Sequence, residues 1–229
     1  MKVNRRIYVV IIICLVIALI FFVYLCYKQN QNIKIYQQQI SIDIDKCIST
    51  IQNRGIIIED NMMSRKDVLD KIINEKRMKT STAKILGEIY YKMGYAYQDL
   101  HQIDVTIYLD NTVSNNLSAS IGIHFSFYIA KQILQQDTYY VSTYDIDWEN
   151  DKFIEIDSEQ LEVFTLMREI EGKWSEILER NGYGKQSHKV FSSNGELFRN
   201  GRWRNVLSEF SEYSNKLKVE NRIALKYLF

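Results

Sequence analysis

Carboxylates gather in the middle of the chain and alternate with other side chains. The four are Asp145, Asp147, Glu149 and Asp151. Oxygen ligands in this alternation are typical of calcium-binding loops, which also need a glycine at position six and a glutamate at position twelve. Asn150 and Ile156 stand at those positions, so the spacing excludes an EF-hand. We expect a solvated acidic surface that can meet a partner, while a looser cation site stays open.

A basic and aromatic cluster stands near the C-terminus. Its members are Arg199, Arg202, Trp203 and Arg204. Such a cluster can contact an anionic polymer, an anionic headgroup or an acidic protein. The alternative is an ordinary loop-to-helix junction with Trp203 in the core. Because the acidic and basic clusters have opposite charges, both are candidate partner-binding sites, and they could also pair within one molecule.

Other patterns that could support catalysis or metal binding are incomplete. Ser81 and Lys84 have the S-x-x-K spacing of serine acyl-enzymes, but no K-T-G strand follows. We therefore expect Ser81 to cap a helix. The three histidines are far apart and have no cysteine beside them, which does not fit a zinc site: His101, His124 and His188. The sequence predicts no catalytic residue, no metal and no cofactor.

An apolar run near the N-terminus precedes the elements that position these groups. Residues 7–27 contain no charge, and as a helix they would span about 31 Å, the thickness of a bilayer's hydrocarbon core. Tyr8, Tyr24 and Tyr27 stand near its ends, where aromatic rings favour the headgroups. The run is longer than the apolar part of a signal peptide and no small-residue cleavage site follows. We expect an uncleaved anchor in the lipid bilayer.

The flanking charges predict the orientation of this anchor. Lys2, Arg5 and Arg6 precede it, whereas Lys28 and Lys34 follow it, which favours a cytoplasmic N-terminus and an extracytoplasmic domain. Removing the three leading residues from the 29 basic residues leaves 26 against 28 acidic ones. This balance gives the domain no general attraction to nucleic acid.

An amphipathic stripe follows the anchor and predicts a stalk helix over residues 28–54. Its members step by three and four: Asn30, Ile33, Gln37, Ile40, Ile44, Cys47 and Ile51. The stripe could pack on the chain's own domain, or it could pair two parallel stalks in a homodimer with Cys47 facing its twin. Cys47 is the only cysteine outside the anchor, so the domain cannot form an internal disulfide.

Periodicity predicts a mainly all-α fold for residues 55–229. Helices are expected at 64–78, capped by Ser64 and Asp67, at 81–109, at 117–136 as an antiparallel partner, from Ser158 to a stop at Asn181, and from Trp203 onward. Residues 110–118 favour a turn. Strand-forming residues at 139–143 and 153–156 predict a minor β-hairpin or an ordered loop. The predicted order is a cytoplasmic tail (1–6), a transmembrane helix (7–27), a stalk (28–54) and the helical domain.

These features predict a function of a general kind. We expect a non-enzymatic, membrane-anchored module that binds a protein partner outside the cytoplasm. It would belong to an envelope, secretion or conjugation assembly, or act as an immunity protein. The alternative is a ligand-sensing helical bundle that signals through a membrane partner, because a stalk continuous with the anchor can carry motion.

Overall fold

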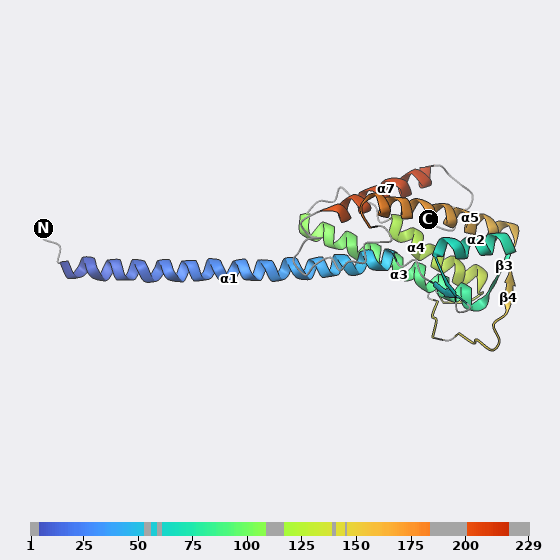
Figure 1. Cartoon of the computed structure of the whole chain (residues 1–229), viewed down its shortest axis with the longest axis horizontal. Coiled ribbons are helices and arrows are strands. Elements are labelled where there is room, and N and C mark those ends of the chain that lie inside the picture. Colours follow the sequence, from blue (N-terminus) through green and yellow to red (C-terminus); the bar gives the residue numbers. More distant parts are fainter. Residues whose placement is uncertain are drawn as a thin grey trace.

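A long helix and a helical domain at its end make up the molecule (Figure 1). The computed structural model describes residues 5–52, 56–58, 61–108, 117–138, 141–144, 146–183 and 201–219. Helices dominate these ranges, and the strands are short. The mainly all-α prediction is therefore confirmed for the part of the chain that the structure describes.

Helix α1 runs without a break over Arg5–Gln52, a length of about 72 Å. It contains neither glycine nor proline, which break helices most often. It is long and apolar enough to cross a membrane, with a mean hydropathy of 2.7 over its most apolar 18-residue window, and no residue of that window is buried. The prediction that the apolar run continues into the stalk is confirmed.

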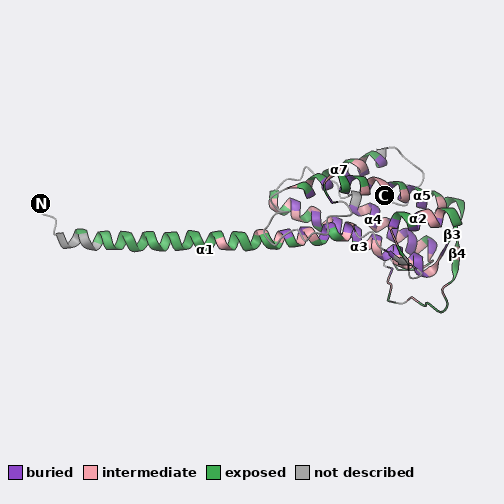
Figure 2. Cartoon of the chain, in the orientation of Figure 1, coloured by how far each residue is buried: buried purple, intermediate pink, exposed green. Residues whose placement is uncertain are grey.

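The last turns of α1 are part of the domain core. Ile44, Ile48 and Ile51 have exposures of 2% or less and lie against α3 (Thr80–Tyr108). Figure 2 shows the change along α1, from exposed over most of its described length to buried where it enters the domain. Of the two expectations for the stripe, packing on the chain's own domain is the one that the structure shows for residues 44–51.

Helix α2 (Arg65–Glu75) begins where the sequence predicts and ends earlier. The Ser64 hydroxyl accepts a hydrogen bond from the Asp67 amide at 3.1 Å, and the Asp67 carboxylate accepts one from the Ser64 amide at 3.2 Å. The predicted extension to Met78 is wrong. Lys76 adopts a left-handed conformation (φ 54°) that ends the helix, and the next three residues form a strand.

Two small antiparallel pairs of strands complete the fold. Strand β3 (Arg77–Lys79) pairs with β4 (Phe153–Glu155), with Met78 opposite Ile154. The predicted strand near 153–156 is therefore confirmed. The predicted hairpin is wrong for the described residues 141–143, which form a loop, because β4 pairs with a segment far away in sequence. Strands β1 (Ile56–Ile58) and β2 (Asn61–Met63) form a second pair that the sequence reasoning missed.

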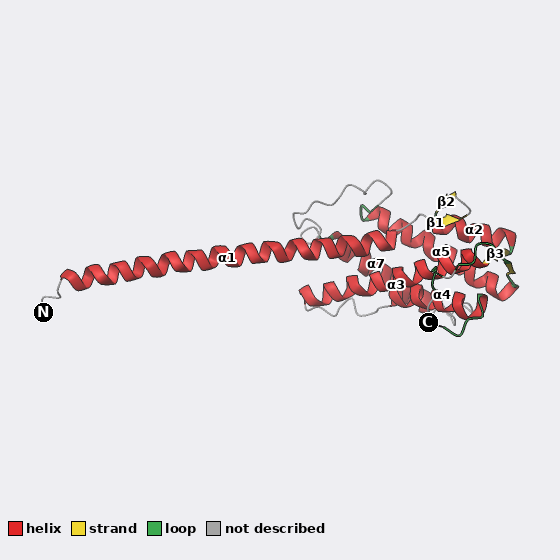
Figure 3. Cartoon of the chain, turned by 90° about the horizontal axis from the view of Figure 1, so that it is seen from below, coloured by secondary structure: helices red, strands yellow, loops and turns green. Residues whose placement is uncertain are grey.

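The remaining helices pack around α3. They are α4 (Leu117–Tyr128), the π-helix η1 (Ile129–Ile133), α5 (Ser158–Arg180) and α7 (Arg202–Val219). The predicted antiparallel hairpin of α3 and α4 is confirmed, since Gly94 lies beside Ala119, whereas Gly87 lies beside Ile129. Residues 110–116 of the predicted turn at 110–118 fall outside the described residues. Figure 3 shows the helices lying roughly along the direction of α1.

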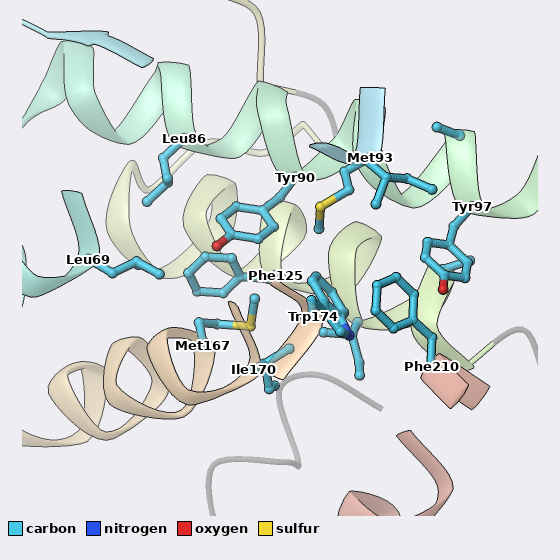
Figure 4. Close-up of a cluster of buried hydrophobic side chains, with 14 of the residues drawn as sticks. Leu69, Leu86, Tyr90, Met93, Tyr97, Phe125, Met167, Ile170, Trp174 and Phe210 are labelled. Carbon is cyan, nitrogen blue, oxygen red and sulfur yellow. The ribbon is translucent and has the colours of Figure 1, made fainter. Parts of the chain in front are cut away.

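Aromatic rings fill the centre of the domain (Figure 4). Tyr90 meets Phe125 edge to face, with ring centroids 4.8 Å apart, and the ring centroid of Phe210 lies 5.0 Å from that of Tyr97 and 5.6 Å from that of Trp174.

Helix α3 runs antiparallel to α1, so its C-terminus lies where α1 leaves the domain. We call this the proximal end. The N-terminus of α3, with β3 and β4, marks the distal end.

Candidate functional site

The acidic candidates lie on a loop at the distal end, leading into β4. We call described residues 141–144 and 146–152 the distal loop; Asp145 falls outside the described residues. Figure 1 shows it as a trace that projects from the domain next to β3 and β4. The structure thus places Asp147, Glu149 and Asp151 together, as the sequence suggested.

Hydrogen bonds fasten the distal loop to the first turns of α3 at two places. The Asp151 carboxylate accepts bonds from the Ser81 amide at 2.9 Å and from the Ser81 hydroxyl at 2.6 Å. At the other end, the Thr143 amide donates to Glu88 at 2.9 Å. Burial works to raise the pKa of Glu88, but hydrogen bonds from Lys92 and Thr143 outweigh it and lower that pKa. The loop is therefore held in one shape by charged acceptors.

The same contacts correct the expectation for Ser81. Helix α3 begins at Thr80, and the Ser81 hydroxyl donates its hydrogen bond to Asp151. The acceptor that satisfies the first turn of α3 therefore comes from Asp151, far away in the sequence. Ser81 lies inside the first turn and does not cap the helix.

Large aromatic side chains stand out from the fastened loop. Tyr144 is 90% exposed and Trp148 is 62% exposed. Between them, the Asp147 carboxylate accepts bonds from the amides of Glu149 and Asn150 at 3.2 Å and shapes the turn. The bonds from Asn150 lower the pKa of Asp147, so the turn stays anionic at neutral pH. Exposed Trp and Tyr side chains on a preorganised loop are typical of protein-binding hot spots.

Two of the three described members of the basic cluster, Trp203 and Arg204, pack against or bind other residues of the same chain. Trp203 is fully buried, the Arg204 Nε lies 2.6 Å from an Asp104 carboxylate oxygen, and the Arg204 guanidinium lies 3.8 Å from the centre of the Tyr108 ring. Arg202 is exposed, and Arg199 falls outside the described residues. The structure therefore shows the loop-to-helix junction, with Trp203 in the core.

The acidic and basic clusters stand at opposite ends of the domain. Asp151 is bound at residue 81 of α3, and Arg204 is bound at residue 104 of the same helix. These positions are about 35 Å apart along the helix axis. The described members of the two clusters therefore do not pair with each other.

A buried ion pair joins α1 to the core, and sequence reasoning missed it. The Arg65 Nε lies 2.7 Å from a Glu171 oxygen, and its Nη2 donates to the Ile51 carbonyl at 2.9 Å. Both side chains are about 95% buried. Burial works to lower the pKa of Arg65, but the Glu171 carboxylate outweighs it and raises that pKa. No spacing signalled the pair, because its members are 106 residues apart.

A polar cleft of about 280 Å³ opens onto this ion pair. Its walls come from the start of α2 and from α5: Ser64, Arg65, Lys66, Asp67, Glu171, Ser175, Leu178 and Glu179. The guanidinium that lines the cleft also holds the last turn of α1. A molecule bound here would therefore lie next to the junction between α1 and the domain.

Replacing Asp151 with alanine is expected to lower the free energy of unfolding by about 1 kcal/mol, because the first turn of α3 loses its acceptor. Urea denaturation of the full chain in mild detergent measures this change. Asp147→Ala is the matched control, since Asp147 accepts bonds only within the exposed turn. Equal losses in both variants would contradict a special role for Asp151.

Cys47, the predicted interchain contact, lies between α1 and α3 and is 8% exposed. Burial raises the pKa of its thiol to about 12, and the carboxylates of Asp99 and Asp43 add to this shift. The thiolate is the reactive form, so iodoacetamide at pH 8 should alkylate Cys47 about 100-fold more slowly in the folded protein than in urea. Mass spectrometry of a chain with Cys14 and Cys26 changed to serine measures this; equal rates would contradict the burial.

Metal ligands do not cluster in the part of the chain that the structure describes, where no group of three or more His, Cys, Asp or Glu side chains converges. The distal loop and the cleft at Arg65 are two candidate sites among the described residues. Comparison of the chain with protein-family models, with curated proteins and with solved structures finds no match.

Proposed function

We propose that this chain is a membrane-anchored interaction module, with its N-terminus in the cytoplasm and its domain outside. Helix α1 supports the anchor, because its uncovered apolar half matches the thickness of a bilayer. The same helix continues into the core without a break, so it holds the domain at a fixed height. A partner would be a component of an envelope, secretion or conjugation assembly, or a toxin that the chain neutralises.

The position of the distal loop supports its role as the contact with that partner. If the bilayer ends near Tyr27, the middle of the α1–α3 contact lies about 30 Å farther out and the start of α3 about 50 Å out. The distal loop thus stands at the part of the domain farthest from the lipid. A protein that approaches the membrane from outside would meet this loop first.

The observation that carries the proposal is the exposure of Trp148 and Tyr144 on a loop that α3 fastens at two places. Little ordering is needed on binding, so more of the contact energy remains as affinity. Asp147 and Glu149 flank Trp148, which favours a partner with an apolar pocket surrounded by basic residues.

Pull-down of the full chain from solubilised membranes tests the contact. We expect a partner that is recovered with the wild type and reduced about tenfold or more with Trp148→Ala. Tyr95→Ala is the control, because Tyr95 is also exposed but lies on α3 away from the loop. Recovery that is equal in all three chains would reject the loop as the contact, and no stable partner in several detergents would argue against the module itself.

Fractionation tests the anchor independently of the partner. We expect the full chain to stay in the membrane pellet after carbonate washing, and external protease to digest the domain in intact cells with a permeable wall. Intact protein in the soluble fraction would reject the anchor, whereas protection from external protease would reject the orientation.

The cleft beside Arg65 favours a second candidate function, ligand sensing. The same guanidinium faces the cleft and binds the Ile51 carbonyl of α1, so a ligand there could act on the membrane helix. A thermal-shift screen of the full chain against small polar molecules separates the two functions, because a saturable shift would favour sensing.

A further inference from the structure

An apolar groove of about 530 Å³ lies at the proximal end, between α1 and the last turn of α3. Its walls are formed by Gln29, Asn32, Ile33, Tyr36, Gln37 and Ile40 of α1 with Thr106 and Ile107 of α3. Ile33 is 48% exposed and Tyr36 is 64% exposed. An exposed apolar surface as extended as this groove is typical of a site that a partner covers.

The groove continues a face of α1 that begins inside the apolar segment. Residues on this face follow one another by steps of three and four: Ile11, Cys14, Ala18, Phe22, Leu25, Gln29, Asn32 and Tyr36. All of them are exposed in the single chain. Because α1 is one unbroken helix, they form a continuous strip along it. We call this strip the free face.

Lipid does not reach the outer part of the groove. Residues 33–40 lie about 9–20 Å beyond Tyr27 along the helix, whereas the headgroup layer on each side of a bilayer is about 5–8 Å thick. Most of the groove is therefore in the aqueous layer, whereas Gln29 and Asn32 at its inner end stand at the level of the headgroups. An occupant that covers both the groove and the part of the free face inside the apolar segment has to run through the membrane beside α1, as a second membrane-crossing helix does.

The chemistry of the free face suits an identical helix. A two-fold axis places equivalent residues close to one another, so a charge on the face would repel its twin. The only charges between residues 7 and 42 are Lys28 and Lys34, and both lie off the face. The amides of Gln29 and Asn32 can each donate and accept, so they can pair with their own copies. The small side chains of Cys14 and Ala18 allow two helices to approach closely.

We propose that two copies of this chain pair in parallel along the free face, with α1 of the second copy covering the groove. The pairing rests on the membrane anchor of the proposed function and names one partner of the module. It differs from a pair made through the Cys47 stripe, because the domain itself covers that stripe from Ile44 onward. The free face is turned by about 100° around α1 from the stripe, because Gln29, Asn32 and Tyr36 each directly precede a residue of the stripe.

Disulfide crosslinking of the full chain in native membranes tests the pairing. Cys14 and Cys26 are changed to serine, buried Cys47 is kept, and either Tyr36→Cys or Gln38→Cys is added. Both positions are exposed, but Gln38 lies on the opposite side of α1. Mild oxidation is expected to give about fivefold more dimer with Tyr36→Cys than with Gln38→Cys, unchanged when the membranes are fused with excess lipid.

A second variant tests the electrostatic argument. Asn32→Lys places two like charges at the axis and should abolish the crosslink at residue 36, whereas Gln38→Lys should leave it unchanged. Equal dimer at positions 36 and 38, no dimer at either, or a crosslink from position 36 to a different protein would each overturn the pairing. Loss of the chain from the membrane pellet would instead reject the anchor, so the two failures are distinguishable.

Discussion

Replacing Glu171 with alanine is expected to lower the free energy of unfolding by about 3–5 kcal/mol. The change leaves the Arg65 guanidinium buried without its carboxylate, and a lone buried charge is costly. Arg65 also donates to Ile51, so the end of α1 should loosen with it. Urea denaturation of the full chain in mild detergent measures the loss.

Two further variants separate this effect from a general loss of charge. Glu176→Ala removes the acid of an exposed ion pair with Lys173 on the same helix, and its effect on stability should be much smaller because solvent screens that pair. Replacing both Arg65 and Glu171 with methionine should restore much of the stability, since no unpaired charge remains. A Glu171→Ala chain as stable as Glu176→Ala would show that Arg65 does not need its partner.

The second large effect concerns the crossing of α3 and α4. A Cβ atom on Gly122 would lie 2.9 Å from the Tyr90 carbonyl oxygen and 3.2 Å from the Gly94 Cα, both of them backbone atoms that cannot turn aside. Gly122→Ala should therefore destabilise the protein by about 1–3 kcal/mol. The reason is close approach of the two helices, so the same denaturation measurement should show a lower midpoint.

Gly172 of α5 is the matched control for this prediction. A Cβ atom there meets nothing within 4 Å, so Gly172→Ala gains only helix propensity. We expect it to raise the free energy of unfolding by up to about 1 kcal/mol. The two alanines thus have opposite expected signs, and changes of the same sign would contradict the close packing of α3 and α4.

The sequence predicted the elements that depend on local patterns. The steps of three and four along α3, the Ser64 cap of α2 and the stop after α5 each reflect residues that are close in the chain, and the structure has all three. The uninterrupted α1 was predictable for the same reason. Local chemistry is sufficient to place such features.

Pairings between distant residues could not be predicted in this way. The whole α3–α4 hairpin separates β3 from β4 in the sequence, and it also separates Ser81 from Asp151. No local spacing therefore predicts either contact. The Arg65–Glu171 pair is hidden for the same reason. The acidic loop was found from its carboxylates, but the importance of Trp148 and Tyr144 emerged only from their exposure.

Because α1 is uninterrupted, it also sets how the domain is rotated around the helix axis relative to the apolar N-terminal segment. Each residue turns a helix by about 100°, so the direction in which the distal loop points is set by the number of residues between Tyr27 and the core. Adding one residue to this stretch would rotate the loop by about 100° around the axis of α1, whereas adding seven would return it almost to its original direction. A partner that rotates the domain would therefore also rotate the apolar N-terminal segment of α1.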